Sequence, residues 1–411
     1  MVECWLPYGD TEVSVSVPVR KLMATVEPGE GRPVEDLTYE VLRAVEKPVH
    51  SEPLRDMLKP GIKVSVAVDP GISGVVWETL RILVPRMTEL GVEAEDVTVI
   101  VGRRFDEPLI KPRKPRRPLP EGVRVVWHDP VETPSERVGV TSLGTAVEVC
   151  KAFREADLKV SVSEVRPHPS AGYVGGRSVI LSVSSLETLR GNMSLMLDRM
   201  AKPGLINGNP VHEDMVEASM MAGLDVSLNV ALDERGRPIA VSFGEPMHSF
   251  LECVKAVEER ASVELVGRAG VVVASPGGAP WDRFLYRALD ALIHVEEAVK
   301  RSGAVVLVAE CSGGVGVRGF VELFSKNPRA LRSEMHRRFI PGAWKALAVS
   351  RMLSRRPVIV SSALPMRTLV RMGLTPAYTA QDGLMKAYEE VGETSVIIAP
   401  HASYTLIRRG T

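Results

Sequence analysis

A glycine-rich loop with a single histidine carries the first candidate chemistry. The loop, EVRPHPSAGYVGGRS at residues 164–178, follows an apolar, strand-like run and contains His168. An imidazole with an ordinary pKa of about 6.5 can take up and release protons near neutrality. The pair Gly175 and Gly176 lets backbone N–H groups approach a phosphate or carboxylate closely. We predict that His168 is a general acid or base; the alternative is a histidine that only fixes the turn.

Three further glycine-rich loops follow predicted strands, at 69-DPGISG-74, 275-SPGGAPWD-282 and 310-ECSGGVG-316. Ligands of open parallel sheets bind at the carboxyl ends of the strands, where a helix N-terminus also favours negative charge. None of these loops matches the dinucleotide or P-loop fingerprint. Asp69 can either orient a ligand or bond the N–H groups of its own loop, and the sequence leaves both open.

Arginines stand in several of these segments, and they predict a small anionic ligand such as a carboxylate. Arg104, Arg177 and Arg287 are the candidates for binding it, because a guanidinium can hold a carboxylate with two hydrogen bonds. Salt bridges between the two predicted domains are the equal alternative. His212, at the start of a predicted helix, is a possible metal ligand, although a histidine there is more often simply exposed.

The bulk composition excludes several classes of function. The chain has 411 residues, 51 basic and 51 acidic, so a general attraction to nucleic acid or to an anionic membrane is not expected. The basic run 111-KPRKPRRP-118 is broken by prolines and has no stacking aromatic, which indicates a solvated loop. No apolar stretch is long enough to span a bilayer. The sequence leaves the oligomeric state open.

The cysteines and the amides indicate the cellular setting. Four separate cysteines without a Cys-x-x-Cys pair, and a start without a basic and apolar leader, predict reduced thiols in the cytoplasm. One glutamine and five asparagines, beside abundant Glu, Arg and Val, suggest a thermophilic source.

The elements that must position these residues alternate between strand and helix, which predicts an α/β fold of two domains. We expect a larger, more irregular α/β domain over residues 1–260 and a smaller Rossmann-like domain with a parallel sheet over 261–411, with a ligand cleft between them. Predicted strands include 62–68, 97–101, 227–232, 270–274, 304–309, 357–360 and 395–399. Predicted helices include 75–90, 186–200, 210–222, 246–261, 282–301 and 342–353.

The chain resembles the nickel-dependent lactate racemase family over nearly its whole length. The matching stretches are 54-LRDMLKPGIKVSVAVD-69, 152-AFREADLKVSVSEVRPHPSAGYVGGR-177, 207-NGNPVHEDM-215, 222-AGLDVSLNVAL-232, 274-ASPGG-278 and 308-VAEC-311. The resemblance implies a racemase or epimerase of 2-hydroxy acids, in which a nickel-pincer nucleotide accepts hydride from the α-carbon. A lysine holds that cofactor covalently, a histidine ligates the nickel and two histidines move the hydroxyl proton.

Carried over residue by residue, the resemblance places His168 on one of the proton-moving histidines and Asp69 on a site aspartate. Ser178, after Gly175-Gly176-Arg177, stands where the family has its lysine. Met193 stands near the position at which the family has its nickel-binding histidine. The chain is therefore identified as a divergent member that lacks several cofactor and catalytic residues.

The second half of the family pattern is also altered. Tyr286 matches, but Arg287 and Asp290 stand where the family has a glutamine and a lysine, and Trp344 aligns with a cofactor-packing tryptophan. By resemblance, Tyr286, Trp344 and the loop around Ser178 would adjoin the cofactor. Two alternatives to the family reaction stay open: an enzyme that works without this cofactor on a carboxylate or phosphate, and a non-catalytic binding or scaffold protein.

Overall fold

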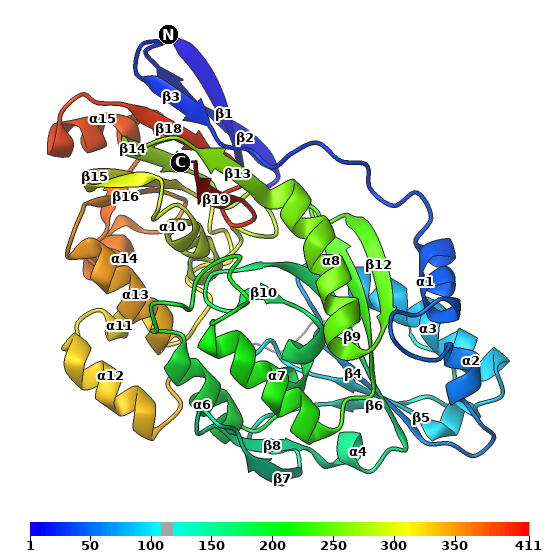
Figure 1. The fold of residues 1–411 in the computed structure, drawn as a ribbon. Coiled ribbons are helices and arrows are strands. Elements are labelled where there is room, and N and C mark those ends of the chain that lie inside the picture. The colour runs from blue at the N-terminus through cyan, green and yellow to red at the C-terminus, as the bar shows by residue number, and fades with distance from the viewer. Residues whose placement is uncertain (108–117, 411) are drawn as a thin grey trace. The chain divides into compact units, whose positions relative to one another are not determined.

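The computed structural model describes residues 1–107 and 118–410, and the chain forms two compact units (Figure 1). The N-terminal unit comprises residues 31–166 and 170–257. The C-terminal unit comprises residues 1–30, 167–169 and 258–411. The predicted basic loop 111–118 lies almost wholly outside the described residues. No helix among the described residues has the length and apolar character needed to cross a membrane.

The N-terminal unit is built on a largely parallel sheet. Its strand order is β12-β11-β9-β4-β5-β6, with β10 paired to β9; every pair along this path is parallel except β11 with β12. The strands are β4 (Val64–Val68), β5 (Val97–Val101), β6 (Arg124–Trp127), β9 (Leu158–His168), β10 (Gly172–Val174), β11 (Val226–Leu232) and β12 (Pro238–Gly244). A separate hairpin pairs β7 (Ser135–Val140) with β8 (Ala146–Cys150). Strands β4 and β11 are buried throughout, including the polar side chains Ser65, Ser227 and Asn229, as expected for a parallel sheet covered on both faces.

Helices of the N-terminal unit begin and end at sequence signals. Asn209 caps α7 by accepting hydrogen bonds from Val211 and His212, Pro210 takes the first helical position, and Gly223 ends the helix with φ 72°. The helices are α1 (Leu37–Glu46), α2 (Leu54–Met57), α3 (Val75–Glu89), α4 (Lys151–Arg154), α5 (Val179–Ser182), α6 (Leu186–Leu195), α7 (Pro210–Ala222) and α8 (Pro246–Ala261). The apolar faces of α1 and α3 pack with the sheet in one continuous core.

The C-terminal unit contains a second parallel sheet. Its order is β17-β16-β15-β14-β18-β3, and each neighbouring pair is parallel. The strands are β3 (Leu22–Thr25), β14 (Ala269–Ala274), β15 (Val299–Val308), β16 (Val358–Ser361), β17 (Thr375–Ala377) and β18 (Val396–Ala399). Two smaller pairs are β1 (Val2–Tyr8) with β2 (Thr11–Val17), and β13 (Ser262–Leu265) with β19 (Leu406–Arg409).

Helices surround this sheet, and α15 packs over its strands together with the hairpin β1–β2. The helices are α9 (Leu285–Ala288), α10 (Asp290–His294), α11 (Phe320–Leu323), α12 (Pro328–Arg337), α13 (Ala343–Leu353), α14 (Met366–Arg371) and α15 (Ala380–Val391). The alternation of strand and helix thus confirms the predicted α/β class in both units.

Two details differ from the sequence prediction. Residues 1–30, which we placed with the first domain, group with the C-terminal unit, because β3 completes the sheet beside β18 and β1–β2 contributes to its core. The continuous helix predicted over 282–301 is wrong: α9 and α10 are short, and β15 already begins at Val299. The Asp282 carboxylate accepts the amides of Gly9 and Glu310 instead of starting a helix.

Candidate functional site

His168 ends β9, and residues Pro167–Pro169 group with the C-terminal unit. The imidazole is fully buried, and its centre lies 6.4 Å from that of the Trp344 ring, with the two planes tilted by 34°. A buried imidazole beside an aromatic ring is shielded from bulk water, so any proton it moves goes to a group held next to it. The structure therefore brings two of the predicted site residues together.

Trp344 lies near the start of α13 and is 1% exposed. Its indole Nε1–H has no acceptor among the residues that the structure describes. A buried donor without an acceptor is costly, and natural structures supply a partner in nearly every case. The indole thus offers a hydrogen bond to an oxygen atom of a bound molecule or water.

Lys345, the next residue, forms a compact cluster with two other site positions. Its ammonium Nζ lies 2.5 Å from Asp290 Oδ1 and donates to the Tyr286 carbonyl over 2.9 Å. The same Nζ lies 3.8 Å from the centre of the Tyr286 ring. An ammonium is thus present beside Asp290, where the resemblance led us to expect a lysine, but α13 supplies it. Arg287, predicted to bind substrate, stacks its guanidinium 5.6 Å from the Phe284 ring.

In the N-terminal unit, the loop after β4 is closed by a carboxylate of the protein itself. The Glu164 side chain accepts the amides of Ile72 and Ser73 and the Ser73 hydroxyl, over 3.0–3.3 Å. Burial favours a raised pKa for Glu164, but the charges of Arg166 and Arg104, together with the hydrogen bonds from these amides, outweigh it and lower the pKa. The amides that a ligand would use at this loop are therefore already bonded.

Asp69, in the same loop, accepts the Gly71 amide over 2.9 Å and the Ser182 hydroxyl over 3.0 Å. Burial raises the pKa of this carboxyl group. Asp69 thus makes the turn contact that was one of its two predicted roles, while its second oxygen fixes Ser182.

Arg104 is engaged by acidic neighbours. Its guanidinium donates to both oxygens of Asp106, at 2.9 and 2.8 Å, and lies 3.5 Å from Glu107. These carboxylates raise the pKa of Arg104 against the opposing effect of burial. This salt bridge lies within the N-terminal unit, and Arg104 stays only a predicted substrate ligand.

The loop of Gly175–Ser178 is held by hydrogen bonds to the protein. Gly175 has φ 116°, and its amide donates to the Ser178 hydroxyl over 2.9 Å. The Gly176 amide donates to Ser163 and Asn229, over 2.8 and 2.9 Å. Ser178 is fully buried. The backbone donors predicted for a cofactor are therefore already paired.

Arg177 is also fully buried, and its N–H groups donate hydrogen bonds to other residues of the N-terminal unit. Its Nε donates to His212 Nδ1 over 3.0 Å, and its terminal nitrogens donate to the carbonyls of Gly175 and Tyr173, both over 2.9 Å. The guanidinium stacks 4.0 Å from the Phe250 ring centre. Burial lowers the pKa of Arg177 to about 9, and burial together with this cation lowers the pKa of His212 to about 2.

These residues do not fit a nickel-pincer nucleotide held as the family holds it. Ser178 has a hydroxyl that is bonded to a backbone amide, Met193 is a thioether buried in α6, and His212 points its Nδ1 lone pair at a cation. Among the described residues, no group of three or more His, Cys, Asp or Glu side chains is arranged to hold a metal ion.

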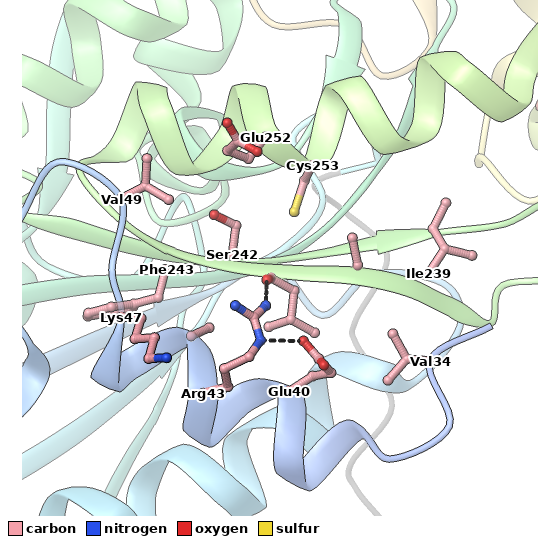
Figure 2. Close-up of a pocket in the computed structure, with 13 residues that line it drawn as sticks. Val34, Glu40, Arg43, Lys47, Val49, Ile239, Ser242, Phe243, Glu252 and Cys253 are labelled. Atoms are coloured by element: carbon pink, nitrogen blue, oxygen red, sulfur yellow. Dashed lines mark hydrogen bonds and ion pairs between the residues drawn. The ribbon is translucent and has the colours of Figure 1, made fainter. Parts of the chain in front are cut away.

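A groove of about 350 Å³ runs along β12, between α1 and α8 (Figure 2). Arg43 crosses it, bonded to Glu40 over 2.7 Å and to the Val241 carbonyl over 3.3 Å. None of the predicted site residues lines this groove. It lies at the edge strand of the sheet.

Sequence reasoning missed two residues that organise these sites, Lys345 and Glu164. Lys345 is the only charged residue in the apolar helical run 343-AWKALAV-349, and a charge at such a position signals a buried partner. Glu164 lies within β9, which is buried from Val160 to His168, and a carboxylate there gives the same signal.

Comparison with known proteins agrees with this architecture. The lactate racemase N-terminal domain model matches residues 8–204, and the lactate racemase C-terminal domain model matches residues 266–404. The lactate racemase of Thermoanaerobacterium thermosaccharolyticum is 26% identical over 99% of this chain and 100% of its own length. That of Lactiplantibacillus plantarum is 24% identical over 97% of both chains.

Solved structures show the same fold. The lactate racemase apoprotein from Thermoanaerobacterium thermosaccharolyticum superposes with a TM-score of 0.86, at 24% identity, over 99% of this chain and 100% of its own. A protein from Thermotoga maritima superposes with a TM-score of 0.65, at 14% identity, over 93% of this chain and 100% of its own. With both domain models matched in order along one chain, this protein belongs to the lactate racemase family.

Proposed function

We propose that this protein is an isomerase-type enzyme that binds a small 2-hydroxycarboxylate and exchanges a proton with it through His168. The observation that carries the proposal is the pairing of buried His168 with Trp344, whose Nε1–H has no acceptor among the described residues. A 2-hydroxycarboxylate brings what this pair needs: carboxylate oxygen atoms that accept a hydrogen bond and an α-hydrogen that a histidine can take up as a proton. Family membership supports this substrate class.

The proposal assigns binding and proton transfer to residues of this chain. The imidazole of His168 takes the α-hydrogen of the ligand as a proton, and the electron pair of the broken C–H bond stays on the ligand as an enediolate. The proton then returns to either face of the α-carbon, so that the step balances without a co-reactant. Trp344 donates to a ligand oxygen through Nε1–H. The indole and the imidazole are both buried, so the two interactions gain strength from the exclusion of water.

The test is the interconversion of D- and L-lactate by the purified protein in D₂O, followed by chiral chromatography and mass spectrometry. We expect interconversion that is lost when His168 is replaced by Gln, while the folded structure is kept. Replacement of His336, an exposed histidine of α12, is the matched control and should leave the rate unchanged. Equal rates for wild type and His168→Gln would exclude the proposed role.

A second candidate is a ligand-binding protein of the same fold without turnover. It is favoured by the internal closure of the N-terminal loops, in which Glu164, Arg104 and Arg177 use protein groups as partners. Calorimetric titration with lactate separates the two: heat of binding without interconversion supports this candidate, and interconversion excludes it.

A further inference from the structure

A buried ion pair in the C-terminal unit is not used by the proposed reaction. Lys345 has no exposed surface, and Asp290 is 8% exposed. Their charged atoms lie 2.5 Å apart. Burying an ammonium and a carboxylate costs more than their attraction returns unless the geometry is good, so such a pair is weak evidence for stability alone.

The pair joins the segments that carry the predicted ligand-binding residues. Asp290 begins α10, the Tyr286 carbonyl that accepts from Lys345 lies in α9, and Lys345 itself lies in α13. One ammonium therefore fixes α9 and α10 to α13. The break between α9 and α10 lies directly beside this bond.

Trp344 is the neighbour of Lys345 on the first turn of α13, so the two side chains move with the same turn. The Lys345 ammonium lies 5.2 Å from the Trp344 ring and 3.8 Å from the Tyr286 ring. The ammonium thus lies close to both aromatic rings. A shift of this ammonium would change the position of Tyr286 and the orientation of the Trp344 indole relative to His168.

We propose that the Lys345–Asp290 pair is a positioning device that sets Tyr286 and Trp344 for ligand recognition beside His168. The inference rests on the proposed function and deepens it, since neither residue touches the proton that His168 moves. Two apolar residues of similar volume could fill the same space, but they would not reproduce the directed bond to the Tyr286 carbonyl.

The experiment compares Lys345→Met, Asp290→Asn and the double variant Lys345→Met with Asp290→Leu. Lactate affinity is measured by calorimetry, and stability by urea unfolding. We expect each single variant to weaken lactate binding about tenfold, because a displaced Trp344 would lose about one hydrogen bond to the ligand. The double variant, which leaves no unpaired charge, should recover stability but not affinity. Recovery of both would overturn the positioning role and leave a purely structural one.

A second readout does not depend on lactate. The indole N–H resonances of the tryptophans are recorded in ¹⁵N-labelled protein, and Trp344→Phe assigns that of Trp344. We expect Lys345→Met to shift the Trp344 resonance and to leave those of Trp5 and Trp127 in place. An unchanged Trp344 resonance would contradict the inference even if lactate binds. A shifted resonance in a protein that binds no lactate would retain the positioning role and reject the proposed function.

Lys386 provides a matched control within the same unit. It too pairs with an aspartate, Asp382 at 3.2 Å, donates to a carbonyl, that of Pro376 at 2.8 Å, and lies near a tyrosine ring, that of Tyr378 at 5.7 Å. It differs in being partly exposed. Lys386→Met should change neither the lactate affinity nor the Trp344 resonance.

Discussion

The guanidinium of Arg177 donates a hydrogen bond from Nε to Nδ1 of His212 over 3.0 Å, in the interior of the N-terminal unit. Because Nδ1 accepts, the proton of this neutral imidazole stands on Nε2. The nearby cation and burial both oppose protonation, which is why the pKa of His212 falls to about 2. A histidine held in this way supports the loop through Arg177 and is poorly suited to accept a metal at Nδ1.

This pair gives the stability of the protein a defined pH dependence. The folded pKa of His212 lies below the unfolded value of about 6.5, so the unfolded chain binds the extra proton as the pH falls through 6.5. We expect the titration of His212 to lower the free energy of unfolding by about 1.5 kcal/mol when the pH falls from 6.5 to 5.0. Urea unfolding of wild type and His212→Gln at both pH values measures this difference.

Glutamine can still accept from Arg177 through its amide oxygen, so His212→Gln keeps the pair while removing the titration. His128, whose pKa burial also lowers, is present in both proteins and cancels in the comparison. Identical pH slopes for the two proteins would show that His212 is not buried next to the cation in solution.

A second prediction concerns the Glu164 carboxylate that closes the loop after β4. Glu164→Ala removes the acceptor of the Ile72 and Ser73 amides and leaves Arg166 without the charge 3.2 Å from its Nε. We expect a loss of about 3 kcal/mol in unfolding free energy, the usual cost of breaking a buried charged pair. Denaturant unfolding at neutral pH measures it.

Glu187→Ala is the matched control, because Glu187 pairs with Arg190 on the exposed face of α6. Surface pairs of this kind contribute less than about 1 kcal/mol. A Glu164→Ala variant no less stable than this control would mean that the Glu164 contacts contribute little to the fold.

Much of the fold could be predicted because strand and helix signals are local. Mainly apolar runs at 62–68 and 227–232 predicted buried parallel strands, which the structure has at 64–68 and 226–232. Asn209-Pro210 predicted the start of α7 at its observed residue. The helix expected over 282–301 failed because contacts distant in sequence override its propensity: Gly9 and Glu310 hold Asp282, and Lys345 takes the Tyr286 carbonyl.

The candidate site was predictable only in part, for a related reason. The histidine at position 168 indicated acid–base chemistry from its residue type alone. The partners of a charged side chain, in contrast, are known only once the chain has folded. From the sequence, Arg104 and Arg177 were equally expected to bind a ligand or to form salt bridges between the domains. Only the structure shows that Asp106 pairs with the first and that backbone carbonyls accept hydrogen bonds from the second. Lys345 was missed because its role depends on Asp290, fifty-five positions away along the chain.

The last prediction concerns the family cofactor, and the protein's mass tests it. We expect the chain, co-produced with the enzymes that make the nickel-pincer nucleotide, to show its unmodified mass and well under one nickel per chain. Ser178 has no amine with which to form the covalent link, and its hydroxyl receives the Gly175 amide over 2.9 Å in a fully buried position. The T. thermosaccharolyticum lactate racemase, loaded in the same cells, is the positive control. A mass adduct with about one nickel on this chain would show that the cofactor is anchored elsewhere, and lactate racemisation by the loaded protein would then be the reaction to measure.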